Sequence, residues 1–197
     1  MKAKVALVDK KRFNFHWFPV GTYNGLVKSS DIYQSIMHGY GRFLYDNGDS
    51  YEGLWRDNTR HGRGKFVKPD HESYAGEWKH DRFDGFGECK WPDGDSYVGY
   101  FKEDKRDGFG RYISPQRAQY KHYGLHKNGL RHGVGEYLDL RLQHRFIGNY
   151  ANDQRDGEGL YMWSDVKVYY GTYKADKRHG EGIYRWPNGD CFVGMYE

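Results

Sequence analysis

Large aromatic residues alternate with glycine along most of this chain. A tyrosine or phenylalanine, one variable residue and a glycine recur about every two dozen residues, and a Gly-x-Gly motif follows nine residues after that glycine. Within a copy such as 51–66, rings and glycines stand at alternate positions, which is the period of a β-strand. Polar residues 57–61 separate the two alternating segments of this copy. Several copies end in an Asn-Gly or Asp-Gly pair, which is typical of tight hairpin turns. Each copy therefore predicts one β-hairpin.

Aligned copies place the rings in three columns. Glycine normally weakens a strand, so its repetition needs a steric reason. Because neighbouring strands lie about 4.8 Å apart, we expect each glycine to leave a slot for a ring. His122 and His126 interrupt the first two columns, and Cys89 interrupts the third. The columns are Tyr51, Tyr74, Tyr97, Phe146, Tyr169 and Phe192; then Trp55, Trp78, Phe101, Tyr150, Tyr173 and Tyr196; then Phe43, Phe66, Tyr112, Tyr137, Tyr161 and Tyr184.

The motif Tyr-x-Gly-x-Trp, followed by Gly-x-Gly, a further aromatic residue and Gly-Asp, resembles the MORN repeat (membrane occupation and recognition nexus) from about Tyr51 to Glu197. The resemblance implies an all-β fold: an elongated single-layer antiparallel sheet of tandem MORN-type β-hairpins, twisted and curved, with an aromatic groove. We expect about fifteen strands. About seven repeats would fill residues 21–197, the first irregular and the last partial, and residues 1–20 would form a basic, aromatic N-terminal cap or tail.

Some copies depart from the motif. The departures cluster between Ser114 and Arg145, where insertions occur and the turn glycine is absent. His71 and Val166 also stand where other copies carry that glycine. We expect altered loops at these places, and they are the first candidates for partner-specific contacts.

The charge of the chain is unevenly distributed. The formal net charge is +4, and residues 1–20 alone contain five basic residues and one acidic residue. The remainder is therefore neutral, whereas a nucleic-acid-binding surface would show a basic excess on the folded region. We predict no nucleic-acid partner. The basic residues of the tail, Lys2, Lys4, Lys10, Lys11 and Arg12, are candidates for contact with an anionic membrane.

Few other features of the sequence indicate a class of protein. The two cysteines, Cys89 and Cys191, form no CxxC pair, which favours a reducing compartment. No apolar run approaches the roughly 20 residues of a membrane helix. The chain contains no nucleophile elbow, Walker loop or HExxH motif. We therefore expect a soluble cytoplasmic protein that is not an enzyme and uses no cofactor.

Three sets of residues are candidate binding sites. Ten histidines suggest metal, but equivalent positions would lie about 10 Å apart, too far for bonds of about 2.1 Å to one zinc. An arginine column could form a basic edge, although acids two or three residues earlier, such as Asp57, Asp153 and Asp176, would pair with it. A third set could line a partner-binding groove. The basic edge is Arg60, Arg82, Arg106, Arg131, Arg155 and Arg178; the groove is Trp55, Trp78, Trp91, Phe101, Tyr150, Trp163, Tyr173 and Trp186.

These patterns support three functional hypotheses. The favoured one is a scaffold that holds a helix or extended peptide of a protein partner along the groove, since a repeat of about 10 Å matches two turns of helix. The resemblance adds a cytoskeletal setting, including cilium, flagellum and axonemal partners. The alternatives are a peripheral tether that binds anionic phospholipid and an accessory repeat region of a larger enzyme. Self-association through the C-terminal edge strand is a further expectation.

Overall fold

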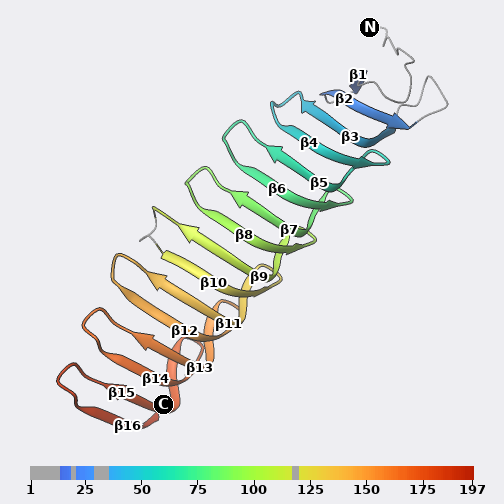
Figure 1. Cartoon of the computed structure of the whole chain (residues 1–197). Coiled ribbons are helices and arrows are strands. Elements are labelled where there is room, and N and C mark those ends of the chain that lie inside the picture. Colours follow the sequence, from blue (N-terminus) through green and yellow to red (C-terminus); the bar gives the residue numbers. More distant parts are fainter. Residues whose placement is uncertain (1–13, 19–20, 29–35, 117–119) are drawn as a thin grey trace. The chain divides into compact units, whose positions relative to one another are not determined.

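The computed structural model describes residues 14–18, 21–28, 36–116 and 120–197. All regular secondary structure in these ranges is β-strand, with no helix (Figure 1). The sixteen strands are β1 (Asn14–Phe18), β2 (Gly21–Lys28), β3 (Ile36–Tyr45), β4 (Ser50–Arg56), β5 (Thr59–Val67), β6 (Ser73–Lys79), β7 (Arg82–Lys90), β8 (Ser96–Lys102), β9 (Lys105–Ser114), β10 (Tyr120–Lys127), β11 (Leu130–Asp139), β12 (His144–Ala151), β13 (Gln154–Met162), β14 (Val168–Lys174), β15 (Lys177–Arg185) and β16 (Cys191–Tyr196).

Neighbouring strands in the chain are neighbours in the sheet. The described pairs within each unit are antiparallel. The predicted class, an all-β antiparallel sheet of tandem hairpins, is therefore confirmed, with one strand more than expected. The chain divides into two compact units, Met1–Pro92 with Phe101–Asp104, and Asp93–Tyr100 with Lys105–Glu197. We refer to these as the first and the second unit.

The strand register places glycine opposite glycine. Gly53 of β4 pairs with Gly41 on one side and with Gly64 on the other. In the second unit Gly171 pairs with Gly159 and Gly182 in the same way. Because side chains alternate along a strand, these glycine rows share one side of the sheet with the ring columns. We call that side the ring face and the opposite side the outer face.

Two kinds of turn join the strands. Two-residue turns such as Asp57–Asn58, with φ angles of 49° and 66°, connect β4 to β5 and its equivalents, which matches the type I′ geometry of tight hairpins. The longer turns at the other end contain the predicted glycines, as at Gly48 with φ 88°. His71 and Val166 keep the same turn without glycine, at φ 71° and 59°. These two loops have therefore lost the glycine and kept its left-handed backbone, which for a β-branched valine is strained.

The irregular first repeat buries a ring in the same way as the later repeats. Tyr23 of β2 is fully buried, and its hydroxyl donates to the carbonyl oxygen of Leu26 at 2.8 Å. Tyr51 makes the equivalent bond to Leu54 at 2.9 Å. The backbone of β1 pairs with β2 from Asn14↔Gly25 to Phe18↔Gly21. The basic residues Lys2, Lys4, Lys10, Lys11 and Arg12 lie outside the described residues.

Candidate protein-binding face

Glycine slots on the ring face hold the first ring column. A Cβ on Gly64 would lie 2.2 Å from the hydroxyl oxygen of Tyr51, and one on Gly110 would lie 2.1 Å from that of Tyr97. Both tyrosines are fully buried. Real Cβ atoms do not approach other atoms this closely, so only glycine fits beneath each ring. The predicted steric role of the glycines is thus visible in both units.

The second ring column packs edge-on against the first. Trp78 lies between Tyr51 and Tyr74, each with a centroid distance of 5.2 Å and nearly perpendicular planes. Its indole N–H donates to the carbonyl oxygen of Gly64 at 3.1 Å. In the second unit Tyr173 lies between Phe146 and Tyr169 at 5.3 Å from each. Such edge-to-face pairs add about 0.5–1.5 kcal/mol each beyond simple burial, so the columns are the main packing of the sheet.

The arginine column covers these rings. The guanidinium carbon of Arg60 lies 4.3 Å from the Trp78 ring centroid, and that of Arg131 lies 4.8 Å from Tyr150. Arg155 and Arg178 each lie over three rings. Guanidinium over an aromatic face is a favourable cation–π geometry. These arginines therefore pack as part of the ring face.

Their acidic partners come from the following repeat. The Nε of Arg60 donates to Asp81 at 3.0 Å, and its terminal nitrogen donates to the Asp81 carbonyl oxygen. Arg131 binds Asp153 and Arg155 binds Asp176 in the same manner. For Arg60, Arg131 and Arg155, the expected pairing with the acid two or three residues earlier is wrong, because the type I′ turn of the next hairpin is closer in space. Each pair thereby joins adjacent repeats.

Arg82 is not a member of this column. In the β6–β7 hairpin the residue opposite Trp78 is Phe83, whereas in the β4–β5 hairpin the residue opposite Trp55 is Arg60. The Phe83 ring stacks on the Tyr74 ring, with centroids 3.7 Å and planes 10° apart. Arg82 instead reaches Glu103 at 3.7 Å on the surface. Arg106 keeps the column position and donates to the Gly129 carbonyl oxygen at 2.6 Å.

One repeat replaces both rings by histidine. His122 and His126 are 2% and 4% exposed, with ring centroids 5.3 Å apart. Both nitrogens of His122 and Nδ1 of His126 have no hydrogen-bond partner. Burial lowers the pKa of His122 to about 3 and that of His126 to about 4. Both rings are therefore neutral at pH 7 and occupy the positions of tyrosine and tryptophan, and His122 does so without a hydrogen bond from either ring nitrogen.

The predicted groove residues divide into two groups. Trp55, Trp78, Phe101, Tyr150 and Tyr173 are buried, at 2–6% exposure, so they leave little surface for a partner. Trp91 and Trp163 are half-buried, and Trp186 is 41% exposed. The groove set remains a prediction, and its accessible members are the rings next to the longer turns.

In the second unit the accessible rings form a continuous row that we call the ring ladder: Tyr161, Trp163, Tyr184 and Trp186. Successive centroids are 4.4, 5.6 and 4.6 Å apart. Arg155 lies over Tyr161 at 5.6 Å and Arg178 over Tyr184 at 5.4 Å. Trp163 begins the loop that contains the strained Val166, whose N–H donates to the Trp163 carbonyl oxygen. The ladder thus combines aromatic faces, neighbouring cations and a constrained loop.

The described part of the chain was compared with the requirements of a metal site and of a membrane span. In the ranges that the structure covers, no three His, Cys, Asp or Glu side chains are grouped for an ion. The same ranges contain no helix long and apolar enough to cross a membrane. Cys89 is buried and Cys191 is exposed.

Two buried aspartates of the second unit accept hydrogen bonds within or beside the region of sequence departures. Asp95 accepts hydrogen bonds from Tyr112 and Ser114 and is 4% exposed. Asp139 is also buried and accepts from the backbone N–H of Leu142 at 2.8 Å. The tandem motif gave no signal for these contacts, because the partners of Asp95 lie 17 and 19 residues away.

The MORN repeat model matches residues 33–50, 51–73, 74–96, 97–117, 127–139, 146–165 and 169–191. The chain therefore belongs to the MORN-repeat family. The match omits 118–126, although His122 and His126 occupy ring positions there.

Two solved structures align with much of the chain at low sequence identity. The TCP domain of SAS-4 from Drosophila melanogaster, in complex with a proline-rich motif of Ana2, aligns with a TM-score of 0.48 and 11% identity over 80% of this chain and 84% of that one. The TCP10c domain of Drosophila melanogaster Sas-4 aligns with a TM-score of 0.44 and 11% identity over 80% and 93%. No curated protein sequence matches the chain.

Proposed function

We propose that this MORN-repeat chain is a non-enzymatic scaffold that binds a peptide segment of a protein partner along the ring ladder. The observation that carries the proposal is the accessibility of the ladder beside buried columns on the same face. Tryptophan, tyrosine and arginine are the residues that dominate protein-binding energetics, and all three meet here. The buried columns already hold the sheet together, so the half-buried rings are available for a ligand.

The ladder spacing matches a peptide. Trp163 follows β13 and Trp186 follows β15, two strands further along, so they lie about 10 Å apart. Three residues of a polyproline II segment span about 9 Å, and seven residues of α-helix span about 10.5 Å. Either backbone would present an apolar side chain to each tryptophan in turn. Aromatic-lined grooves are a recurring platform for extended segments.

The arginine column gives little support to a lipid tether. Arg60, Arg131 and Arg155 are bound to aspartates and lie over rings. A phosphate would have to displace an aspartate from each. The cytoskeletal or ciliary setting stays part of the proposal through the family resemblance alone, and it is tested by the identity of the partner.

The test is affinity capture from a cell extract with the full chain, followed by mass spectrometry. We expect at least one protein that is retained by the wild type and lost with Trp163→Ala combined with Trp186→Ala. The matched control is Leu44→Ala, an outer-face residue that is 50% exposed and should change nothing. Retention of the same proteins by the double variant, with an unchanged melting temperature, would contradict ladder binding.

The bound segment of a captured partner is then tiled as synthetic peptides. A proline placed in the middle of a helical ligand removes binding because it breaks the helix. The same proline leaves a polyproline II ligand bound. Fluorescence titration with each peptide therefore distinguishes the two backbones.

A further inference from the structure

The outer face of the second unit carries an apolar row across five strands. Cross-strand pairing aligns residues Ile147, Leu160, Tyr170, Ile183 and Val193 directly opposite one another. Three of them are strongly exposed: Tyr170 at 51%, Ile183 at 41% and Val193 at 69%. Exposed contiguous apolar surface of this kind marks an interaction site.

The same row in the first unit is charged, which provides an internal control. Its members are Arg42, Glu52, Lys65, Ala75 and Glu88, aligned by the same kind of pairing. Opposite charges alternate along it, as expected for a face that remains in water. The apolar row is therefore a property of the second unit and does not follow from the repeat architecture.

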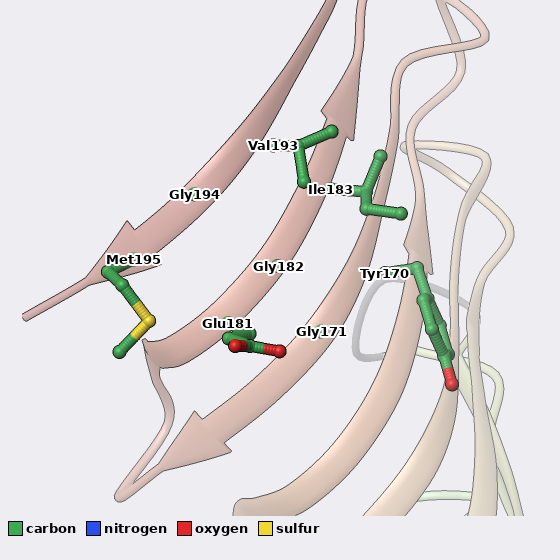
Figure 2. A pocket seen from close by; sticks show the side chains of 8 residues that line it. All are labelled: Tyr170, Gly171, Glu181, Gly182, Ile183, Val193, Gly194 and Met195. Carbon is green, nitrogen blue, oxygen red and sulfur yellow. The ribbon is translucent and has the colours of Figure 1, made fainter.

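A hollow of about 360 Å³ runs beside the apolar row. Figure 2 shows Tyr170, Ile183 and Val193 on one side, with Glu181 and Met195 beyond the intervening glycines. Gly171, Gly182 and Gly194 carry no side chain, so backbone forms the floor. The hollow offers room for side chains of a second layer packed on this face.

Opposite charges flank the apolar row. Two residues before Ile183 on the same strand stands Glu181, and two residues after it stands Arg185. Alternation places all three on the outer face. Both charged side chains are exposed, and neither has an ion-pair partner within the described residues. The strand therefore presents an acid, an apolar residue and a base in that order.

This order is complementary to itself. We propose that a second copy of this chain covers the apolar row, outer face against outer face, about a two-fold axis parallel to that row. The two-fold operation places each apolar row on its own equivalent and brings the acidic flank of one copy over the basic flank of the other. Glu181 of each copy then faces Arg185 of the other, as an isologous interface requires. Two sheets packed in this way lie about 10 Å apart.

The size of the surface sets the expected affinity. Five strands spaced at about 4.8 Å, and three rows along the strands at about 6.8 Å, cover roughly 500 Å² on each copy. The total of about 1,000 Å² is at the lower limit for specific interfaces. We therefore expect a reversible dimer with micromolar affinity.

Sedimentation velocity of the full chain from about 1 to 100 µM tests the proposal. The wild type should shift from monomer to dimer across this range. Ile183→Asp should weaken association at least tenfold, while Leu44→Asp, on the outer face of the first unit, should leave it unchanged. A wild type that stays monomeric, or an Ile183→Asp variant that still dimerises, would overturn the proposal. The latter result would indicate association through the edge strand β16.

Charge exchange tests the two-fold register with substitutions at exposed positions. Glu181→Arg alone and Arg185→Glu alone should each remain monomeric, because like charges then face each other. An equimolar mixture of the two variants should form a heterodimer with wild-type affinity. A mixture that stays monomeric would refute the register. Flotation with neutral phosphatidylcholine vesicles is the competing outcome: if a monomeric wild type binds them and Ile183→Asp does not, lipid covers the face and the dimer is wrong.

Discussion

On the ring face, the buried columns and the ring ladder use the same residue types under different constraints. Tyr51 lies in a glycine slot and Trp78 packs edge-on against it. Both donate hydrogen bonds to backbone carbonyls, and Arg60 lies over both rings. Trp163 and Trp186 have aromatic neighbours, but they remain half-buried or exposed. The difference shows that the number of aromatic rings on a face does not give the area accessible to a partner. The rings of the two buried columns stabilise the sheet, whereas the rings of the ladder keep part of their surface exposed.

Removing one ring from each set should give the largest contrast. Trp78→Ala removes a ring that is 2% exposed and should cost about 3–5 kcal/mol of unfolding free energy. Trp163→Ala should cost about 1 kcal/mol, because much of its surface is in water already. Urea unfolding followed by circular dichroism measures both. Equal losses for the two variants would show that the ladder is as structural as the columns.

Acid should weaken the columns at the histidine pair. The unfolded histidines titrate near pH 6.5, whereas in the folded chain burial holds the pKa of His122 at about 3 and that of His126 at about 4. Below pH 6.5 the unfolded state therefore binds protons that the folded state does not, so stability falls as the pH falls. At pH 5 the loss is about 2 kcal/mol per histidine.

Thermal unfolding at pH 7 and pH 5 measures this loss. The control is His122→Phe with His126→Tyr, which restores the residue types of the following repeat at Phe146 and Tyr150. We expect the variant to lose less stability on acidification than the wild type. The same acid sensitivity in both proteins would show that other groups are responsible.

The sequence was sufficient for the fold, because the repeat is local. Alternation and glycine spacing lie within one hairpin, so the ring columns and their slots could be aligned by eye. The turns at His71 and Val166 differ from expectation: the missing glycine predicts altered loops there, whereas both turns keep the left-handed backbone of the other copies. The one-strand difference from the expected fifteen reflects β1, which lies outside the repeat motif.

The candidate site was less accessible to sequence reasoning. Arg60 and Asp81 are 21 residues apart, whereas proximity in the chain favours Asp57 as the partner of Arg60. The Arg60 guanidinium lies over the Trp78 ring, a contact that no spacing in the sequence reveals. The apolar row on the outer face lies at positions that the motif leaves variable. It becomes visible only when strand register aligns Ile147 with Val193.

The central claim is that rings and glycines fit sterically, and a double-mutant cycle between Tyr51 and Gly64 tests it most directly. Native-state hydrogen exchange of amides in β4 and β5 gives the local free energy for the wild type, Gly64→Ala, Tyr51→Val and the combination. We predict that Gly64→Ala costs about 3 kcal/mol beside Tyr51 and under about 1 kcal/mol beside the smaller valine. The same cost in both backgrounds would contradict the account.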